Sequence, residues 1–303
     1  MPRSRSHTLA HRIEYGLVRA LQGGICALPP GAARELGAAL GSLAYSLGVR
    51  RDVTLGHLRR IFGDERSDAD LERIARESYR NFGRMTFEYG RFPRLTDELI
   101  ERTVSLTGEE HLDRALEGGT GAVLVAGHFG NWELAAALAR LGYPVTFLVG
   151  EQHNRLVDGL MNRLREGLGV ETVPLTGSLL GVFRALRKNR IVAMLSDQDA
   201  GRSGVFVEFL GKQASTPYGP ARLALKTGAP LLPGMAVRHG KDRHELVICP
   251  PVEPPPEAAG EEEAVRHYTR GYTSVFEDFI LRYPEQYFWM HRRWKTRPEG
   301  AAR

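Results

Sequence analysis

The chain has 303 residues, of which 42% are hydrophobic, and this content is ample for a continuous core and excludes a disordered chain. Its 41 Lys and Arg outnumber its 36 Asp and Glu, so the surface favours anionic partners such as phospholipid headgroups, acidic carrier proteins or nucleic acid. The only two cysteines, Cys26 and Cys249, lack the spacing of a disulfide framework or a thiolate metal site. We interpret both as core side chains in a reducing compartment.

The N-terminal segment is basic and then weakly apolar. Basic side chains gather in residues 3–12, and the apolar stretch 15–29 is interrupted by Arg19. A membrane span needs roughly 20 consecutive apolar residues, so this stretch predicts neither a signal peptide nor a span. Its larger apolar residues recur at helical spacing: Leu17, Val18, Leu21 and Ile25. This spacing is typical both of a helix lying in a membrane interface and of a helix packed on the domain, and both interpretations stay open.

The first third of the chain is predicted to be helical, with helices over 32–47 and 68–89. From residue 119 short apolar runs alternate with longer periodic segments, as in βαβ units. Buried strands are expected at 122–126, 145–149, 170–173 and 191–195. The pattern predicts an α/β fold with a mixed, mostly parallel central sheet flanked by helices. We expect a helical region over 1–95, in contact with the membrane and packed on an α/β core over 96–303, in a single domain.

The second half continues with turn and helix signals. Residues 205–210 predict an extended excursion that ends in a turn at Gly211. Ser215, Thr216 and Pro217 are typical of an N-cap and helix start. Further strands are expected at 231–237 and 244–249, followed by a solvated Pro/Glu-rich loop at 250–263 and one last helix.

The most informative stretch is VAGHFGNWE at residues 125–133, where a buried strand ends and a helix is expected to begin near Asn131. In open parallel sheets ligands gather at the carboxyl ends of strands, so His128 lies where an active site is expected. Glu133, in the first helical turn, could orient the imidazole and leave its other nitrogen as a base. The backbone amides around Gly130 and Asn131 are candidate oxyanion donors. The alternative is that these side chains only pack.

Other chemistries lack their motifs. The chain contains no G-x-S-x-G elbow, no Walker A sequence and no G-x-G-x-x-G, and neither cysteine lies beside a candidate base in the sequence. No zinc-like spacing surrounds His128, so we expect no metal and no cofactor. A His and carboxylate pair without a protein nucleophile suits direct attack by an acceptor hydroxyl on an activated acyl group.

The stretch 127–133 resembles the H-x-x-x-x-[DE] motif of the lipid A biosynthesis acyltransferases, the lauroyl and myristoyl transferases within the wider lysophospholipid acyltransferase superfamily. Three further blocks are similar to that family in the same order, at 197–211, 214–230 and 284–298. The resemblance covers nearly the whole chain and implies a glycerolphosphate-acyltransferase-like fold.

The resemblance implies transfer of a fatty acyl chain from an acyl carrier protein or coenzyme A thioester to a lipid hydroxyl. The implied acceptor is an anionic glycolipid or phospholipid, first of all a lipid A precursor. His128 would be the general base and Glu133 its orienting partner. The enzyme would lie at the cytoplasmic face of the inner membrane, as a peripheral or monotopic protein that binds no nucleic acid.

The candidate substrate-binding residues are Asn131, Arg165, Asp197, Asp199, Arg292 and Arg293. Arg165 matches an arginine of the family and could hold phosphate or polarise the thioester carbonyl; the alternative is a solvated helix charge. Asp197 and Asp199 could orient a Gly-rich loop or the phosphopantetheine arm, or only cap a turn. A basic and aromatic tail could bind lipid phosphates, or be a solvated tail; it consists of Arg292, Arg293, Lys295 and Arg297 with Trp289 and Trp294.

The sequence departs from the family in two places, and the first is an N-terminal anchor that is weaker because Arg19 interrupts it. Lipid A enzymes often carry a Tyr-Arg-Pro-like turn after the second core strand, where this chain has VGEQHN at 149–154. That turn borders the expected cleft, so the acceptor stays open, and a phosphatidylinositol mannoside or another membrane lipid is the alternative. Two other functions are weighed as well: an acyl thioesterase, in which water replaces the lipid hydroxyl, and a basic lipid-binding or nucleic-acid-binding module.

Overall fold

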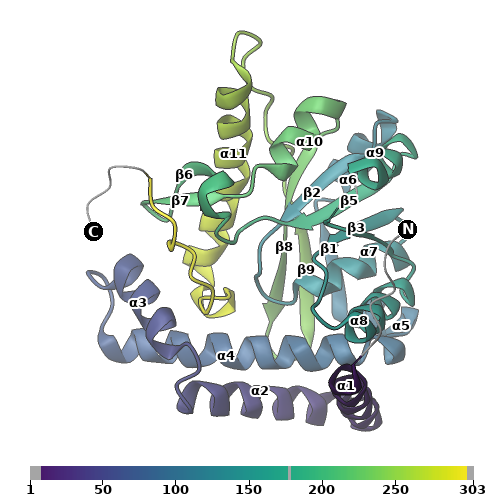
Figure 1. Ribbon diagram of the computed structural model, residues 1–303, viewed down its shortest axis with the longest axis vertical. Coiled ribbons are helices and arrows are strands. Elements are labelled where there is room, and N and C mark those ends of the chain that lie inside the picture. The colour runs from purple at the N-terminus through teal and green to yellow at the C-terminus, as the bar shows by residue number, and fades with distance from the viewer. Residues whose placement is uncertain (1–7, 177–178, 299–303) are drawn as a thin grey trace.

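A seven-stranded sheet forms the centre of the computed structural model, which describes residues 8–176 and 179–298 (Figure 1). The strand order is β1-β9-β8-β2-β5-β3-β4, and every neighbouring pair is parallel except β8 and β9. The strands are β1 (Val104–Thr107), β2 (Ala122–Ala126), β3 (Val145–Val149), β4 (Glu171–Pro174), β5 (Ile191–Leu195), β8 (Leu231–His239) and β9 (Arg243–Ile248). The predicted mixed, mostly parallel α/β sheet is confirmed.

The central strands were the easiest to predict. β2, β3 and β5 have the predicted limits because they are apolar runs, broken only by the buried Thr146 in β3, and lie buried on both faces. β4, β8 and β9 differ from prediction by one or two residues at their ends. β1 was not predicted, since it is a four-residue edge strand with exposed side chains and carries little apolar signal.

The predicted N-cap at Ser215 and Thr216 is wrong. The two residues end strand β7 (Lys212–Thr216), which forms an antiparallel hairpin with β6 (Val205–Phe209) outside the main sheet. The extended segment and turn predicted at 205–211 are confirmed. Both hydroxyl residues are fully buried and pair with β6, and this pairing overrides the local capping signal.

Helices cover both faces of the sheet. The α-helices are α1 (Leu9–Ala27), α2 (Pro30–Ser46), α3 (Arg51–Phe62), α4 (Asp68–Gly90), α5 (Asp97–Thr103), α6 (Glu109–Glu117), α7 (Ala137–Arg140), α8 (Arg155–Glu166), α9 (Leu179–Arg187), α10 (Gly219–Thr227) and α11 (Glu261–Arg282). The 3-10 helices are η1 (Phe92–Arg94), η2 (Trp132–Ala136), η3 (Gly201–Ser203) and η4 (Pro284–Gln286). The helices predicted at 32–47 and 68–89 are confirmed as α2 and α4. Alternate side chains of β2 enter two separate apolar clusters, one on each face.

Two long helices of the N-terminal region lie side by side below the sheet (Figure 1). α2 and α4 approach so closely that a Cβ on Gly83 would overlap the carbonyl oxygen of Gly37. A Cβ on Gly41 would likewise overlap the carbonyl oxygen of Tyr79. Glycine at these positions therefore permits the close approach, and α4 in turn reaches the loop that carries His128, where the Asn81 amide donates to the carbonyl of Gly130.

Helix α1 packs with one face and exposes the other. Ile25 and Gln22 are buried, and the Asn154 amide donates to the carbonyl of His11 and to Glu14. Leu17 is nevertheless 67% exposed. The interpretation as a helix packed on the domain is therefore confirmed for one face, and contact of the other face with a membrane stays a prediction. No helix in the described part of the chain is long and apolar enough to cross a membrane.

Candidate active site

His128 lies in a tight loop directly after the central strand β2. Gly130 has a φ of +57°, and a Cβ on it would overlap the carbonyl oxygen of Ala236. The N–H of Gly130 donates to the carbonyl of Gln286 at 2.9 Å, and the N–H of Phe288 donates to the carbonyl of His128 at 3.0 Å. The loop is therefore held against the C-terminal segment. Because the N–H of Gly130 is occupied, its expected role as an oxyanion donor is wrong.

The carboxylate that contacts His128 belongs to Asp197. His128 Nδ1 lies 2.6 Å from Asp197 Oδ1, and the backbone N–H of His128 donates to Asp197 Oδ2 at 3.0 Å. β2 and β5 are adjacent parallel strands in which Ala126 pairs with Leu195, so His128 and Asp197 each lie two residues beyond that pair. The strand register thus brings the two side chains together at the carboxyl edge of the sheet.

The contact between His128 and Asp197 determines the charge of the carboxyl and the tautomer of the imidazole. Burial alone would raise the pKa of the Asp197 carboxyl, but the His128 ring and its hydrogen bonds outweigh burial and hold this pKa below its ordinary value. An ionised carboxylate can only accept hydrogen bonds, so the neutral tautomer of His128 that fits this contact has its proton on Nδ1 and its lone pair on Nε2. The His128 side chain is 20% exposed, so a substrate can reach the ring.

Aromatic side chains surround the imidazole. The ring centroid of Trp132 lies 5.0 Å from that of His128, and that of Phe288 lies 6.1 Å away. Phe82 of α4 packs against both, with centroids at 6.2 Å from Trp132 and 4.8 Å from Phe288. The base therefore lies beside an apolar wall built from α4, η2 and the C-terminal segment, which suits an acyl chain.

Glu133 does not contact His128 as expected but forms an ion pair with Arg165 of α8. Arg165 Nε and Nη2 donate to the two Glu133 oxygens at 2.9 and 2.7 Å, and both side chains are nearly buried. The Arg165 guanidinium also lies over the Tyr89 ring at 5.4 Å. Arg165 is therefore neither a solvated charge nor free for phosphate. The pair ties η2, which positions the His128 loop, to α8.

Replacing Glu133 with alanine is expected to destabilise the fold by about 3 to 5 kcal/mol, because it leaves the buried Arg165 guanidinium without its partner. The double variant Glu133→Ala, Arg165→Met should recover part of this loss. Urea unfolding of the three proteins tests the expectation. If Glu133 instead oriented His128, the single variant would lose kcat with unchanged unfolding, and the second substitution would recover nothing.

Asn131 and Asp199 both hold neighbouring protein groups. The Asn131 amide donates to Glu88 Oε2 at 2.7 Å. Asp199 accepts the N–H of Gly201 at 3.2 Å, which is the turn-capping alternative, and it also accepts the N–H and hydroxyl of Thr296 at 3.1 and 2.9 Å. Asp199 was predicted to bind substrate, but its carboxylate instead anchors the C-terminal segment over the site.

The basic and aromatic C-terminal segment is buried in part. Arg293 is 1% exposed and donates to the carbonyl of Ser215 at 2.5 Å and to Thr216 Oγ1 at 2.6 Å. Trp289 and Trp294 are buried as well. Of the four basic residues of this tail, Arg293 is buried, whereas Arg292, Lys295 and Arg297 are exposed. The interpretation of Arg293 as a lipid ligand is wrong, because its side chain ties the segment to the β6–β7 hairpin.

Two further histidines flank this region. His291 Nε2 accepts the backbone N–H of Asp199 at 3.0 Å, and burial is the main reason that its pKa is lowered. His57 of α3 bonds the carbonyl of Trp289 at 3.1 Å, and burial lowers its pKa to about 4. His291 lies in the block at 284–298 and His57 in none, and the sequence did not single out either histidine as a site residue. Within the described residues, no three His, Cys, Asp or Glu side chains are grouped to hold a metal ion.

The chain is similar to bacterial acyltransferases over most of its length. A family model described as bacterial lipid A biosynthesis acyltransferase matches residues 3–296. The lipid A biosynthesis lauroyltransferase of Escherichia coli is 31% identical over 272 residues, which cover 88% of this chain and 86% of the relative.

Two mycobacterial relatives are similar too. The phosphatidylinositol mannoside acyltransferase of Mycobacterium tuberculosis is 36% identical over 168 residues, 52% of each chain, so the match spans about half the length of that relative. The protein of the same name from Mycolicibacterium smegmatis is 30% identical over 250 residues, 78% of this chain and 77% of the relative. Since the family model matches almost from end to end and the Escherichia coli relative exceeds 30% identity over most of its length, the chain belongs to the bacterial lipid A biosynthesis acyltransferase family.

Proposed function

We propose that this acyltransferase moves a fatty acyl chain from a thioester onto a hydroxyl of a membrane lipid, with His128 as general base and Asp197 as its orienting partner. The observation that carries the proposal is the 2.6 Å contact between His128 Nδ1 and the buried Asp197 carboxylate, at the carboxyl end of the central strand. It leaves Nε2 as the basic nitrogen of a partly exposed ring.

The reaction needs one base that acts twice. His128 Nε2 takes the proton of the acceptor hydroxyl while its oxygen attacks the thioester carbonyl carbon, and a C–O bond forms. The tetrahedral intermediate collapses, the C–S bond breaks, and the thiolate leaving group takes the proton back from Nε2. Asp197 stabilises the imidazolium between these steps without being protonated itself. The net products are a lipid ester and a free thiol.

Donor and acceptor follow from charge and from the relatives. The formal net charge of +5 favours an acidic carrier protein as donor, and coenzyme A is the alternative. A lipid A precursor is the proposed acceptor, since the Escherichia coli relative that covers most of the chain is named for lipid A biosynthesis. A phosphatidylinositol mannoside is the second candidate, because relatives of comparable similarity carry that name.

We further propose that the protein binds the cytoplasmic face of the inner membrane peripherally, through the exposed apolar side chains of α1 and α2. Four apolar side chains of α1 lie one helical turn apart and are 55% to 74% exposed: Leu9, Ile13, Leu17 and Leu21. α2 also has three exposed leucines, Leu36, Leu40 and Leu43. Such a stripe on an ordered helix is typical of interfacial insertion.

Substituting Leu17 and Leu21 with aspartate is expected to weaken binding to anionic vesicles at least about tenfold, because each leucine removed from water contributes about 1.5 to 3 kcal/mol. Vesicle co-sedimentation measures the effect. Leu180→Asp is the matched control, since Leu180 is 78% exposed on α9, far from α1 in Figure 1. Equal loss in the control, or no loss in the double variant, would contradict this membrane-binding surface.

Transfer of a radiolabelled acyl group tests the reaction and its acceptor. The protein is mixed with labelled acyl carrier protein or coenzyme A thioesters and with vesicles that hold a lipid A precursor, a phosphatidylinositol mannoside, or neither. We expect a labelled lipid ester with the lipid A precursor. If only the phosphatidylinositol mannoside becomes labelled, the acceptor is the mannoside and not the lipid A precursor. Release of free fatty acid at a rate independent of acceptor would identify a thioesterase and refute transfer.

A further inference from the structure

Helix α9 exposes one face that combines apolar and basic side chains. Four side chains at helical spacing line a surface groove on this face: Leu180, Phe183, Arg184 and Arg187. Leu180 is 78% exposed, both arginines are exposed, and Phe183 is half-buried. On the opposite face Val182 and Leu186 are buried. The core therefore fixes α9 from one side, and the helix presents the groove to solvent.

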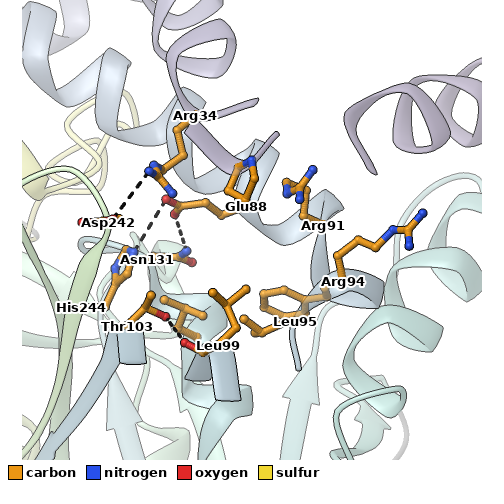
Figure 2. A pocket seen from close by; sticks show the side chains of 13 residues that line it. Arg34, Glu88, Arg91, Arg94, Leu95, Leu99, Thr103, Asn131, Asp242 and His244 are labelled. Carbon is orange, nitrogen blue, oxygen red and sulfur yellow. Dashed lines mark hydrogen bonds and ion pairs between the residues drawn. The ribbon is translucent and has the colours of Figure 1, made fainter. Parts of the chain in front are cut away.

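The positive charge of this face is not neutralised within the described part of the chain. Segment 172–196 contains four basic residues and no acidic one, and neither Arg184 nor Arg187 forms an ion pair with a described residue. Several exposed arginines of other helices do pair with a carboxylate, as in Arg73–Asp70, Arg140–Asp97 and Arg266–Glu262. Figure 2 shows a further pair, Arg34 and Asp242, 4.0 Å apart. The two arginines of α9 are therefore available to an acidic partner.

α9 lies on the same face of the sheet as the residue that follows His128. Val182 and Leu186 belong to the apolar cluster that contains Phe129. β5 follows α9 and runs to the carboxyl edge, where Asp197 lies two residues beyond the strand. β5 has five residues, so the end of α9 lies roughly 16 Å from this edge at about 3.3 Å per residue. An acyl group on an extended phosphopantetheine arm can span such a distance.

The position of α9 suits a partner that is dissolved in water. In Figure 1 α1 and α2 lie at the bottom of the molecule, whereas α9 lies near its top right. A protein that binds a membrane through α1 and α2 would therefore keep α9 away from the lipid. The partner would meet the groove with carboxylates for Arg184 and Arg187, which lie one helical turn apart, and with apolar side chains for Leu180 and Phe183.

We propose that this face of α9 docks an acidic acyl carrier protein through one of its helices. The inference rests on the function proposed above, in which such a carrier protein is the acyl donor. The carrier helix would place its carboxylates on the two arginines and its apolar side chains on Leu180, while its arm reaches along the sheet to His128. Because the charged contacts lie at the surface, binding should weaken as the salt concentration rises.

Steady-state transfer from two donors isolates the docking step. Lauroyl acyl carrier protein brings the carrier domain, whereas lauroyl pantetheine thioester brings only the reacting arm. In the double variant Arg184→Glu, Arg187→Glu we expect the KM for the carrier protein thioester to rise at least about tenfold relative to the KM for the pantetheine thioester, because two attractive contacts become repulsive.

The double variant Arg59→Glu, Arg60→Glu is the matched control. It makes the same change of charge at two exposed arginines of α3, which lies on the left of Figure 1, and it should leave the ratio of the two KM values unchanged. An unchanged ratio in the α9 variant, or an equal rise in the α3 variant, would overturn the proposal. Absence of transfer from both donors would instead refute the proposed function.

Binding without turnover tests the surface independently of the reaction. Calorimetry measures the affinity of the His128→Ala protein for lauroyl acyl carrier protein, and co-sedimentation measures its affinity for anionic vesicles. Adding Leu180→Asp should weaken carrier binding at least about tenfold and spare vesicle binding, whereas adding Leu17→Asp and Leu21→Asp should do the reverse. A misfolded variant would lose both. Unchanged carrier binding in Leu180→Asp, or loss of its vesicle binding, would overturn the proposal.

Discussion

His128→Ala is expected to lower kcat for acyl transfer by about 10²- to 10⁴-fold, the range that a positioned general base contributes. Nε2 of the imidazole is the nitrogen left to act as a base, since Nδ1 is bound to Asp197. The fold should remain intact, because the ring lies at the edge of the structure and is 20% exposed. Steady-state transfer with saturating thioester, together with thermal unfolding, measures both.

His57→Ala is the control for this experiment. His57 is also half-buried beside the C-terminal segment, but it bonds the carbonyl of Trp289 and has no contact with Asp197 among the described interactions. Its loss should leave kcat close to that of the unaltered protein. If acyl transfer persists in His128→Ala, or if kcat falls equally in both variants, His128 is not the general base.

The sequence predicted the position of His128 because that position depends on local signals. The buried apolar run of β2, the glycine-rich turn and the rule that ligands gather at strand carboxyl ends all lie within nine consecutive residues. The glycine at position 130 is a reliable signal for this turn, because its positive φ and the nearby Ala236 carbonyl exclude a larger residue.

The partner of His128 could not be read from the same stretch, because it depends on which strands are neighbours. Glu133 is close to His128 in sequence, but η2 directs it toward Arg165 of α8. Asp197 is 69 residues away and becomes adjacent only because β5 pairs with β2. Both His128 and Asp197 were predicted to follow strand ends, and the strand order was the missing information.

Burial of charge was the other feature that the sequence did not reveal. The charges around Arg292 and Arg293 were interpreted as a surface for lipid, yet Arg293 lies over the Phe209 ring at 4.8 Å and bonds the β6–β7 hairpin. An arginine that is buried by tertiary contacts has the same local pattern as a solvated one, because its partners come from distant segments.

Asp197→Asn is expected to lower kcat by about 10²- to 10⁴-fold while preserving the shape of the site. The reason lies in the two bonds that Asp197 accepts, from the ring Nδ1 and from the backbone N–H of His128. An asparagine oxygen must face the backbone N–H, since that group can only donate. Its NH₂ then faces Nδ1 and forces the ring proton onto Nε2, where the lone pair is needed.

The Asp197→Asn variant distinguishes loss of the correct His128 tautomer from loss of the fold. Asp199→Asn is the matched control, because it removes a nearby carboxylate that holds Thr296 and does not contact the His128 ring among the described bonds. Its effect on kcat should be much smaller. In Asp197→Asn the KM for the thioester should change little, because the aromatic wall around His128 is retained. A loss confined to KM, or an equal loss of kcat in the two variants, would mean that the Asp197 carboxylate supports the segment and not the base.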